Sequence, residues 1–301
     1  VQFVPEIAKV AKHVTIYQRT PNYVNPRQNA FSEEFLAGLR TDPETTIKNE
    51  RRQISAWLDS VCTYDDQEVL AAFKQAAMDN LAQVKDPVVR EKLTPKYPFG
   101  SKRGLVSSDC YPTFNRDNVE LVTDKISRVT EKGIASADGQ ERTFDVIVLA
   151  TGFQTTKFFS AIPVAGKDGR SLSDVWSGGA QAYLGITVPG FPNMFMLYGP
   201  NTNNGSILHN IECQVDYIVG KVSEMERDSI RSIDLKPESC AAYNAALQED
   251  LAKVSVWHSG VSDYYRAESG LIVTQWPHSM TRYQTETQRP DMSAYNVVGG
   301  A

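Results

Sequence analysis

A nearly uninterrupted apolar run at residues 144–150 limits most strongly how this sequence can fold. Its letters are FDVIVLA, so apolar side chains follow one another without the alternation of a strand that has one wet face. Such a run is typical of a strand buried on both faces of a parallel sheet. Ligands of open α/β sheets bind at the carboxyl ends of strands. Thr151 and Gly152, which follow the run, are therefore candidate ligand contacts.

The rest of the sequence alternates between strand and helix patterns. Apolar residues at spacings of three and four predict helices, and short β-branched runs predict strands. Helices are expected at residues 5–13, across much of 31–93, at 207–225 and at 237–257, and further strands at 14–17, 119–122, 126–130 and 194–198. This alternation predicts an α/β fold. We interpret residues 31–93 as an amphipathic helical subdomain that packs its own core and carries no chemistry.

Composition excludes several classes of function. The 31 Lys and Arg residues against 36 Asp and Glu give a net charge of -5, so no general positive field attracts nucleic acid or an anionic membrane. The apolar runs are far shorter than the ~20 residues that cross a bilayer. The four cysteines form no CxxC pair and the four histidines lack metal-ligand spacing, which argues against a redox dithiol and a metal site. We expect a soluble, cytoplasmic protein that holds no metal.

The N-terminal residues match the later part of a dinucleotide-binding unit. No two glycines are separated by a single residue, so the GxGxxG phosphate loop is absent. The chain nevertheless begins with a predicted helix that leads into a strand, which is the order that follows such a loop. If the loop lay just ahead of the first residue, the ribose-contacting position, ~20 residues on, would fall at Gln18, Arg19 and Thr20. An arginine there favours a 2′-phosphate and hence NADPH, whereas an ordinary surface arginine is the alternative.

Two adjacent cations, Lys102 and Arg103, lie in the glycine-containing turn at residues 98–104. Exposed basic pairs are common on loops, so a solvated pair is one interpretation. In the functional interpretation one cation holds a phosphate while its neighbour stabilises an oxyanion formed during a reaction. The sequence alone leaves both open.

Taken together, these segments resemble one family. The similar stretches are TIYQRTPNY at 15–23, PFGSKR at 98–103, FNRDNV at 114–119, DVIVLATGF at 145–153, and YLG at 183–185 through GPNTN at 199–203, together with residues 1–8. They resemble the FAD- and NADPH-dependent Baeyer-Villiger monooxygenases, within the wider flavin-containing monooxygenases. The stretches follow the family order over most of the chain.

The resemblance implies a Rossmann-like flavoprotein fold with two dinucleotide-binding domains. Residues 1–153 would be the remainder of the NADP-binding domain, with the helical insert at about 31–93, and residues 154–301 the C-terminal half of the FAD-binding domain. The N-terminal FAD-binding βαβ unit would be missing, so we expect an N-terminally truncated member. In such enzymes NADPH reduces FAD, O₂ adds to flavin C4a, and the resulting peroxide converts a ketone to an ester or lactone.

The resemblance also implies roles for particular residues. Gln18, Arg19 and Thr20 would contact NADP, the last two at its 2′-phosphate with help from Lys102. Arg103 would lie beside the flavin as the catalytic residue, because a fixed positive charge stabilises developing negative charge. The others expected at the cofactors are Thr151, Gly152, Thr202 and Asn203. The last two precede a predicted helix, whose N–H groups could stabilise the reduced flavin or could belong to a merely solvated cap.

Departures from the family pattern leave alternatives. The family's FAD-binding glycines, active-site acid and FxGxxxHxxxW fingerprint are absent from this sequence. We therefore expect the chain alone to bind FAD weakly or not at all. One alternative function is oxygenation of nitrogen or sulfur, and another is a non-catalytic truncated homologue. A pyridine nucleotide-disulfide reductase would need a nearby redox cysteine pair, which the chain lacks.

Overall fold

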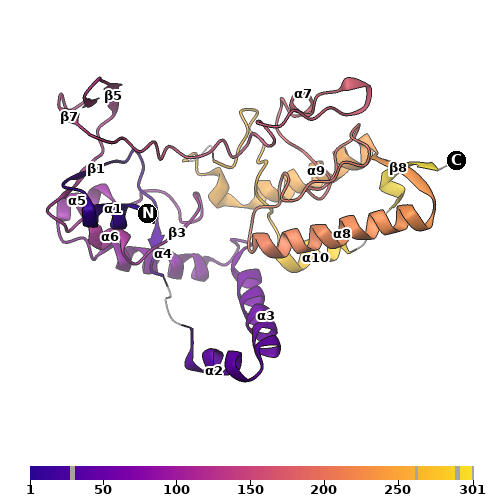
Figure 1. Cartoon of the computed structure of the whole chain (residues 1–301), viewed down its shortest axis with the longest axis horizontal. Coiled ribbons are helices and arrows are strands. Elements are labelled where there is room, and N and C mark those ends of the chain that lie inside the picture. Colours follow the sequence, from indigo (N-terminus) through magenta and orange to yellow (C-terminus); the bar gives the residue numbers. More distant parts are fainter. Residues whose placement is uncertain (28–30, 262–263, 289–291, 300–301) are drawn as a thin grey trace. The chain divides into compact units, whose positions relative to one another are not determined.

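A computed structural model describes residues 1–27, 31–261, 264–288 and 292–299 (Figure 1). The chain divides into two compact units. Unit 1 consists of Val1–Ala30 and Gln67–Phe153, and unit 2 of Phe31–Asp66 and Gln154–Ala301. No helix in these described stretches combines the length and the apolarity that crossing a bilayer requires.

Unit 1 places short strands beside small helices. Strand β1 (Val14–Tyr17) pairs in parallel with β4 (Val119–Val122), and β2 (Val24–Asn25) pairs in parallel with β3 (Leu105–Val106). A separate antiparallel sheet contains β5 (Ile126–Val129), β6 (Gly133–Ser136) and β7 (Glu141–Thr143). The helices are α1 (Val4–Val10), α4 (Gln67–Leu81), α5 (Pro87–Lys92) and α6 (Cys110–Thr113). The parallel pairs place the ends of β1 and β4 at one edge.

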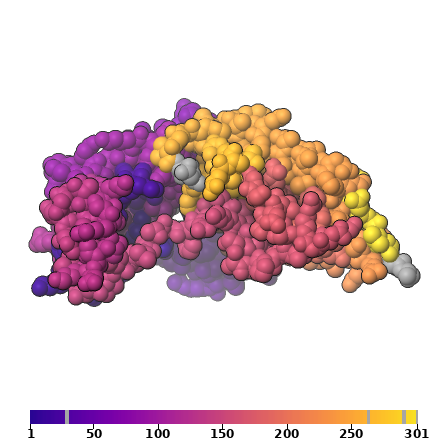
Figure 2. Space-filling view, turned by 90° about the horizontal axis from the view of Figure 1, so that it is seen from above, coloured from indigo at the N-terminus to yellow at the C-terminus, as the bar shows by residue number. Residues whose placement is uncertain are grey.

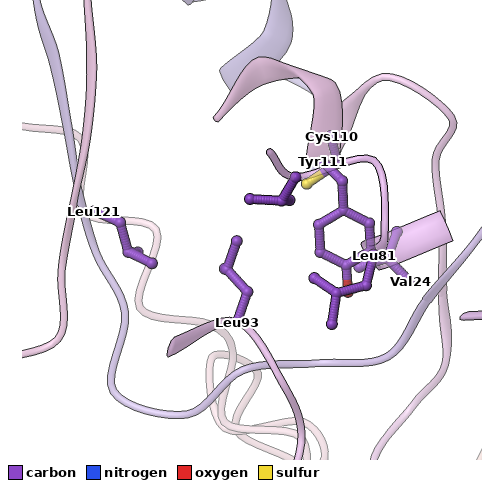
Figure 3. Packing of buried hydrophobic residues seen from close by; sticks show 7 residues of the cluster. Val24, Leu81, Leu93, Cys110, Tyr111 and Leu121 are labelled. Atoms are coloured by element: carbon purple, nitrogen blue, oxygen red, sulfur yellow. The ribbon is translucent and has the colours of Figure 1, made fainter. Parts of the chain in front are cut away.

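The core of unit 1 forms where the helices meet the parallel strands. Tyr111 of α6 packs its ring beside Leu81 of α4 and Val24 of β2 (Figure 3). Leu93 and Leu121 belong to the same cluster and are also buried. Burial of these apolar side chains is the main force that holds the short strands in place, because two-stranded pairs are marginal alone.

Unit 2 is mainly helical. Its helices are α2 (Glu33–Thr41), α3 (Pro43–Val61), α7 (Leu172–Val175), α8 (Ile207–Arg227), α9 (Pro237–Lys253) and α10 (Met280–Thr287), with 3-10 turns at Lys167–Gly169, Ser255–His258 and Met292–Ala294. Strands β8 (Ile230–Leu235) and β9 (Tyr295–Gly299) form an antiparallel pair. Four helices begin at a side chain that accepts the N–H three residues on, as helix N-caps do: Ser32, Asp42, Ser206 and Ser279.

Two strand predictions are wrong. Residues 144–150 form no strand, and residues 145–150 are exposed, Val146 by 76% and Leu149 by 79%. The surface segment can be followed by its colour in the space-filling view (Figure 2). A strand buried on both faces needs neighbouring strands and covering helices, and none of the described residues pairs with this one in a sheet.

Residues 194–198 also form no strand. Met196 is buried and donates its N–H to the carbonyl of Ile186, but Leu197 is 47% exposed. Tyr198 has φ of +54°, a left-handed conformation that ends an extended run. The segment therefore contributes one buried side chain to unit 2 and then turns into the loop that precedes α8.

Candidate functional site

The first candidate site begins where β1 ends. The N–H of Gln18 donates to the carbonyl of Val122 at 2.9 Å, which extends the β1–β4 pairing by one residue. Arg19 and Thr20 follow, and the Arg19 side chain is exposed. The Nε2 atom of Gln18 is buried and has no hydrogen-bond partner among the described residues. A buried donor without a partner carries a cost of ~1–3 kcal/mol, so its presence marks a place where a ligand could bind.

The second part of this site is the loop that carries Lys102 and Arg103. The Lys102 Nζ atom lies 5.7 Å from the centroid of the Tyr97 ring, within the range of a cation–π interaction. Burial lowers the pKa of Lys102, and the positive charge of Arg19 lowers it further. The second effect means that the two cations lie close enough to repel each other. Ser101, 2% exposed, has a hydroxyl with no partner in the described part of the chain.

These observations relate the charges of Arg19 and Lys102 to each other, and Gln18 and Ser101 precede the two cations in the chain. Two cations held near each other are most stable when an anion lies between them. A phosphate offers several acceptor oxygens to a guanidinium, an ammonium and neighbouring neutral donors. The residues present therefore fit the 2′-phosphate of NADP.

Arg103 follows Lys102 in the same loop, and its side chain is exposed. It belongs to unit 1, as Arg19 does. Among the described residues of unit 1, none forms an ion pair or a hydrogen bond with its guanidinium group. Its role beside a flavin stays a prediction.

Thr151 and Gly152 lie in the exposed segment at the end of unit 1. Gly152 has φ of +96°, a conformation that side chains other than glycine rarely adopt. The glycine thus permits a turn just after the apolar run. Neither Thr151 nor Gly152 makes a side-chain contact with Arg19 or Lys102 in the described part of the chain.

The second candidate site is the loop that leads into α8 in unit 2. Thr202 is 1% exposed and donates its hydroxyl to the carbonyl of Gly199 at 2.7 Å. Asn203 accepts the hydroxyl of Tyr198 at 2.7 Å and donates its amide to the Gln275 side chain. The side chains predicted to contact a cofactor are therefore bound within unit 2, and they fix the shape of the loop.

Two further asparagines of this loop and helix escaped the sequence analysis. Asn201 donates to the carbonyls of Ile272 and Gln275, and Asn210 donates to the carbonyl of Thr202. Both are buried, and the Oδ1 atom of each lacks a partner within the described residues. These two acceptors fit a neutral, hydrogen-bond-donating group of a cofactor better than a phosphate.

The FAD pyrophosphate has no matching cradle in this sequence. Backbone N–H groups of a glycine-rich loop usually bind it, and the chain contains no GxGxxG. At the start of α8, Ser206 already accepts the N–H of His209, so one of the free donors of the helix is used. The described residues therefore fit one edge of FAD and not its phosphates.

Thiol and metal chemistry find no support in the site. The four cysteines are free and buried. Burial raises the pKa of Cys62, Cys213 and Cys240 to about 11, so these thiols stay protonated at neutral pH. Across the described ranges, no group of three or more His, Cys, Asp or Glu could hold a metal ion.

Tyr97 is the functional candidate of unit 1 that the sequence analysis missed. Its hydroxyl contacts the carbonyl of Pro21, 76 positions earlier in the chain. An isolated tyrosine in a loop has no periodic pattern, so only its place four residues after Leu93 and five before Lys102 could have drawn attention to it.

Comparison with known proteins extends these observations. No family model matches the chain. It is 36% identical to a Baeyer-Villiger monooxygenase of Pseudomonas aeruginosa, over 99% of this chain and 58% of the relative. It is also 36% identical to the FAD-binding monooxygenase ktnD of Aspergillus niger, over 99% of this chain and 51% of the relative.

A solved structure shares the fold. An oxidized steroid monooxygenase bound to NADP matches with a TM-score of 0.81 and 25% identity, over 100% of this chain and 65% of that one. The chain thus spans about half to two thirds of the proteins it matches. The expected flavoprotein fold is confirmed over this part. Over that span, the chain is similar to FAD-binding and Baeyer-Villiger monooxygenases and shares the fold of the steroid monooxygenase.

Proposed function

We propose that this chain supplies the NADPH-binding region and part of the FAD-binding region of a monooxygenase that uses O₂ to oxygenate ketones to esters or lactones. The observation that carries the proposal is that the charge of Arg19 acts on Lys102 of another loop, while their chain neighbours Gln18 and Ser101 have buried polar atoms without a partner among the described residues. The relative named as a Baeyer-Villiger monooxygenase supports a ketone as the substrate. The structural neighbour bound to NADP supports NADPH as the reductant.

In this proposal the two units have different tasks. Residues 1–153 form the NADP-binding domain remainder and residues 154–301 the C-terminal half of the FAD-binding domain. The division of the chain after Phe153 supports this boundary. Helices α2 and α3 belong to unit 2 and α4 and α5 to unit 1, so the helical block at residues 31–93 contributes to both.

The residues of the chain would act mainly by binding and by charge. Arg19, Thr20 and Lys102 hold the 2′-phosphate of NADPH and so orient the reductant. Arg103 provides a positive charge that stabilises negative charge on the reacting ketone oxygen, an effect typically worth ~3 kcal/mol or more in a shielded site. Bound FAD supplies the transfer of electrons from NADPH to O₂. Four free, buried cysteines are consistent with action in the reducing cytoplasm.

The loop before α8 would serve the flavin side. Asn201 and Asn210 offer buried acceptors for the N–H groups of a flavin edge, and Thr202 and Asn203 keep the loop in shape. The N-terminal end of α8 favours nearby negative charge. These residues would orient a flavin without gripping its phosphates.

Binding of a nucleotide fragment to the purified chain tests the proposal. Adenosine 2′,5′-bisphosphate should bind more tightly than AMP by about tenfold or more, because only the former offers the 2′-phosphate to charged donors. Arg19→Ala should remove most of this preference, whereas Arg128→Ala, an exposed arginine of β5 in the same unit, should not. Equal affinities of the two nucleotides for the wild-type chain, measured by calorimetry, would reject the proposed site.

A further inference from the structure

Tyr97 contacts both of the loops that carry the two cations of unit 1. Its hydroxyl lies 2.7 Å from the carbonyl of Pro21 and 2.9 Å from the Asn22 Oδ1 atom, just after Arg19 and Thr20. Its ring lies under the ammonium group of Lys102. One side chain, 7% exposed, therefore connects the two halves of the proposed 2′-phosphate site.

The position of Tyr97 is itself fixed. Tyr23 donates its hydroxyl to the Tyr97 carbonyl at 2.6 Å, and the two rings meet edge to face with centroids 5.5 Å apart. Tyr111 donates to the Asn22 carbonyl at 3.1 Å and so holds the same loop from another side. The three tyrosines form a cluster that a rotation of the Tyr97 side chain would disrupt.

The cluster works against electrostatic repulsion. Burial lowers the pKa of Lys102 most, and the like charge of Arg19 lowers it further. Loops that carry like charges move apart unless something holds them. The Tyr97 ring attracts the ammonium group while its hydroxyl holds the Arg19 loop. Burial raises the pKa of Tyr97, so its hydroxyl keeps the proton that it donates across the neutral range.

We infer that Tyr97 is a positioning residue that holds Arg19 and Lys102 at the spacing required by a 2′-phosphate, and that it thereby determines discrimination between phosphorylated and unphosphorylated adenosine ribose. The inference rests on the proposed NADPH function. It assigns no contact between Tyr97 and the nucleotide. The tyrosine acts through the two cations, so its loss should change the preference for the 2′-phosphate more than the affinity for the adenosine itself.

The test compares two nucleotides on three variants of the whole 301-residue chain. Calorimetry gives the affinities for adenosine 2′,5′-bisphosphate and for AMP, and their ratio is the readout. Tyr97→Phe removes only the hydroxyl and should lower the ratio about fivefold, the effect of one lost hydrogen bond. Tyr97→Leu also removes the ring and should lower it further. Tyr17→Phe is the matched control, since its hydroxyl contacts Ser136 of β6.

A merely structural role would give a different result. If the substitution destabilised unit 1 as a whole, the affinities for both nucleotides would fall alike and their ratio would stay unchanged. An unchanged ratio in Tyr97→Phe, with a preference for the bisphosphate in the wild type, overturns the inference and leaves the proposed function standing. Absence of any preference in the wild type overturns the proposed function instead.

A second variant tests the inference if Tyr97→Phe does not fold. If circular dichroism shows that Tyr97→Phe is unfolded, Asn22→Ala removes only the side-chain acceptor of the Tyr97 hydroxyl and keeps the Pro21 contact. We expect a smaller fall in the ratio, about twofold. A folded Asn22→Ala with the wild-type ratio would count against Tyr97 as the positioning residue.

Discussion

The two candidate cofactor regions differ in the charge of their side chains and in whether their hydrogen-bond donors have partners. In unit 1, Arg19 and Lys102 are charged side chains beside buried donors that have no partner among the described residues. In unit 2, the loop before α8 consists of neutral side chains whose donors are bound to groups of the same unit, as Asn201 and Thr202 show.

The difference separates affinity from stability. The unit 1 region keeps buried polar atoms without a partner among the described residues, and an exposed cation such as Arg19 contributes little to folding. The unit 2 loop uses its side-chain donors to fix its own shape, and only acceptors such as the Oδ1 atoms of Asn201 and Asn210 stay without a partner among the described residues. Substitutions in unit 1 should change ligand affinity, and substitutions in the unit 2 loop should change the free energy of unfolding.

The largest effect is expected for Asn201→Ala. The change removes the amide that donates to the carbonyls of Ile272 and Gln275, and among the described residues only the Ile272 carbonyl keeps a second side-chain donor, the Gln248 amide. Asn201 also has φ of +58°, which alanine tolerates less well than asparagine. The free energy of unfolding of unit 2 should fall by about 3 kcal/mol. Asn49→Ala, on the exposed surface of α3, is the control and should change it by less than about 0.5 kcal/mol.

Urea unfolding followed by tryptophan fluorescence measures this effect in the correct region. All four tryptophans lie in unit 2: Trp57, Trp176, Trp257 and Trp276. A loss below about 1 kcal/mol would show that the loop before α8 is not held by its own amides and would remove the contrast between the regions.

The two ligands themselves provide the next contrast. The purified chain should bind adenosine 2′,5′-bisphosphate at least about tenfold more tightly than FAD, because charged donors for phosphate are present in unit 1 and the sequence has no glycine-rich loop for the FAD pyrophosphate. Calorimetry gives the first affinity and quenching of flavin fluorescence the second. Tighter binding of FAD would show that the loop before α8 holds the cofactor without a phosphate cradle.

The pH dependence of bisphosphate binding tests the coupling between the two cations. Protonated Lys102 attracts the phosphate, and its pKa is lowered by burial and by Arg19. The affinity should therefore fall about fivefold as the pH rises through the lowered pKa, which lies below the ordinary 10.5. In Arg19→Ala that pKa should rise, so the fall moves to higher pH. Lys102→Met should abolish it, and calorimetry from pH 7 to 11 distinguishes the three curves.

Local patterns predicted part of this molecule correctly. The strands at residues 14–17 and 119–122 and the start of the helix at residue 207 agree with β1, β4 and α8. Each of these predictions depends on residues within a few positions of each other: the β-rich runs of the two strands and the capping residue of the helix. The cations Arg19 and Lys102 could be proposed from the sequence because each lies in a recognisable local motif, and their role at a cofactor stays a prediction.

The errors concern properties that depend on distant neighbours. The apolar run at residues 144–150 has the composition of a buried strand, but burial requires other strands beside it, and the described residues provide none. Tyr97 and Asn201 were missed because their contacts lie 76 and 71 positions away in the chain. Strands β6, β7 and β9 and helix α10 were missed as well, since these short segments are ordered by pairing or packing against the rest of each unit.

The smallest predicted effect compares one ion pair from each unit. Glu120 of β4 accepts from the Arg142 side chain at 2.9 Å, and Arg142 is 15% exposed; Glu212 of α8 pairs with Arg51 of α3 at 2.7 Å, and both are more than half exposed. The hydrogen bonds of Arg142 lower the pKa of Glu120 from its ordinary 4.5, so the stabilisation is present above that pH and is lost as the pH falls through the lowered value. After allowance for solvent screening, Glu120→Gln should lower the free energy of unfolding of unit 1 at pH 7 by about 0.5–1 kcal/mol, and Glu212→Gln should change that of unit 2 by about 0.3 kcal/mol or less.

Hydrogen exchange of the β1 and β4 amides measures the effect of Glu120→Gln, and tryptophan fluorescence measures the effect of Glu212→Gln. Equal losses, or a Glu120→Gln loss that persists in acid, would show that unit 1 does not depend on this pair.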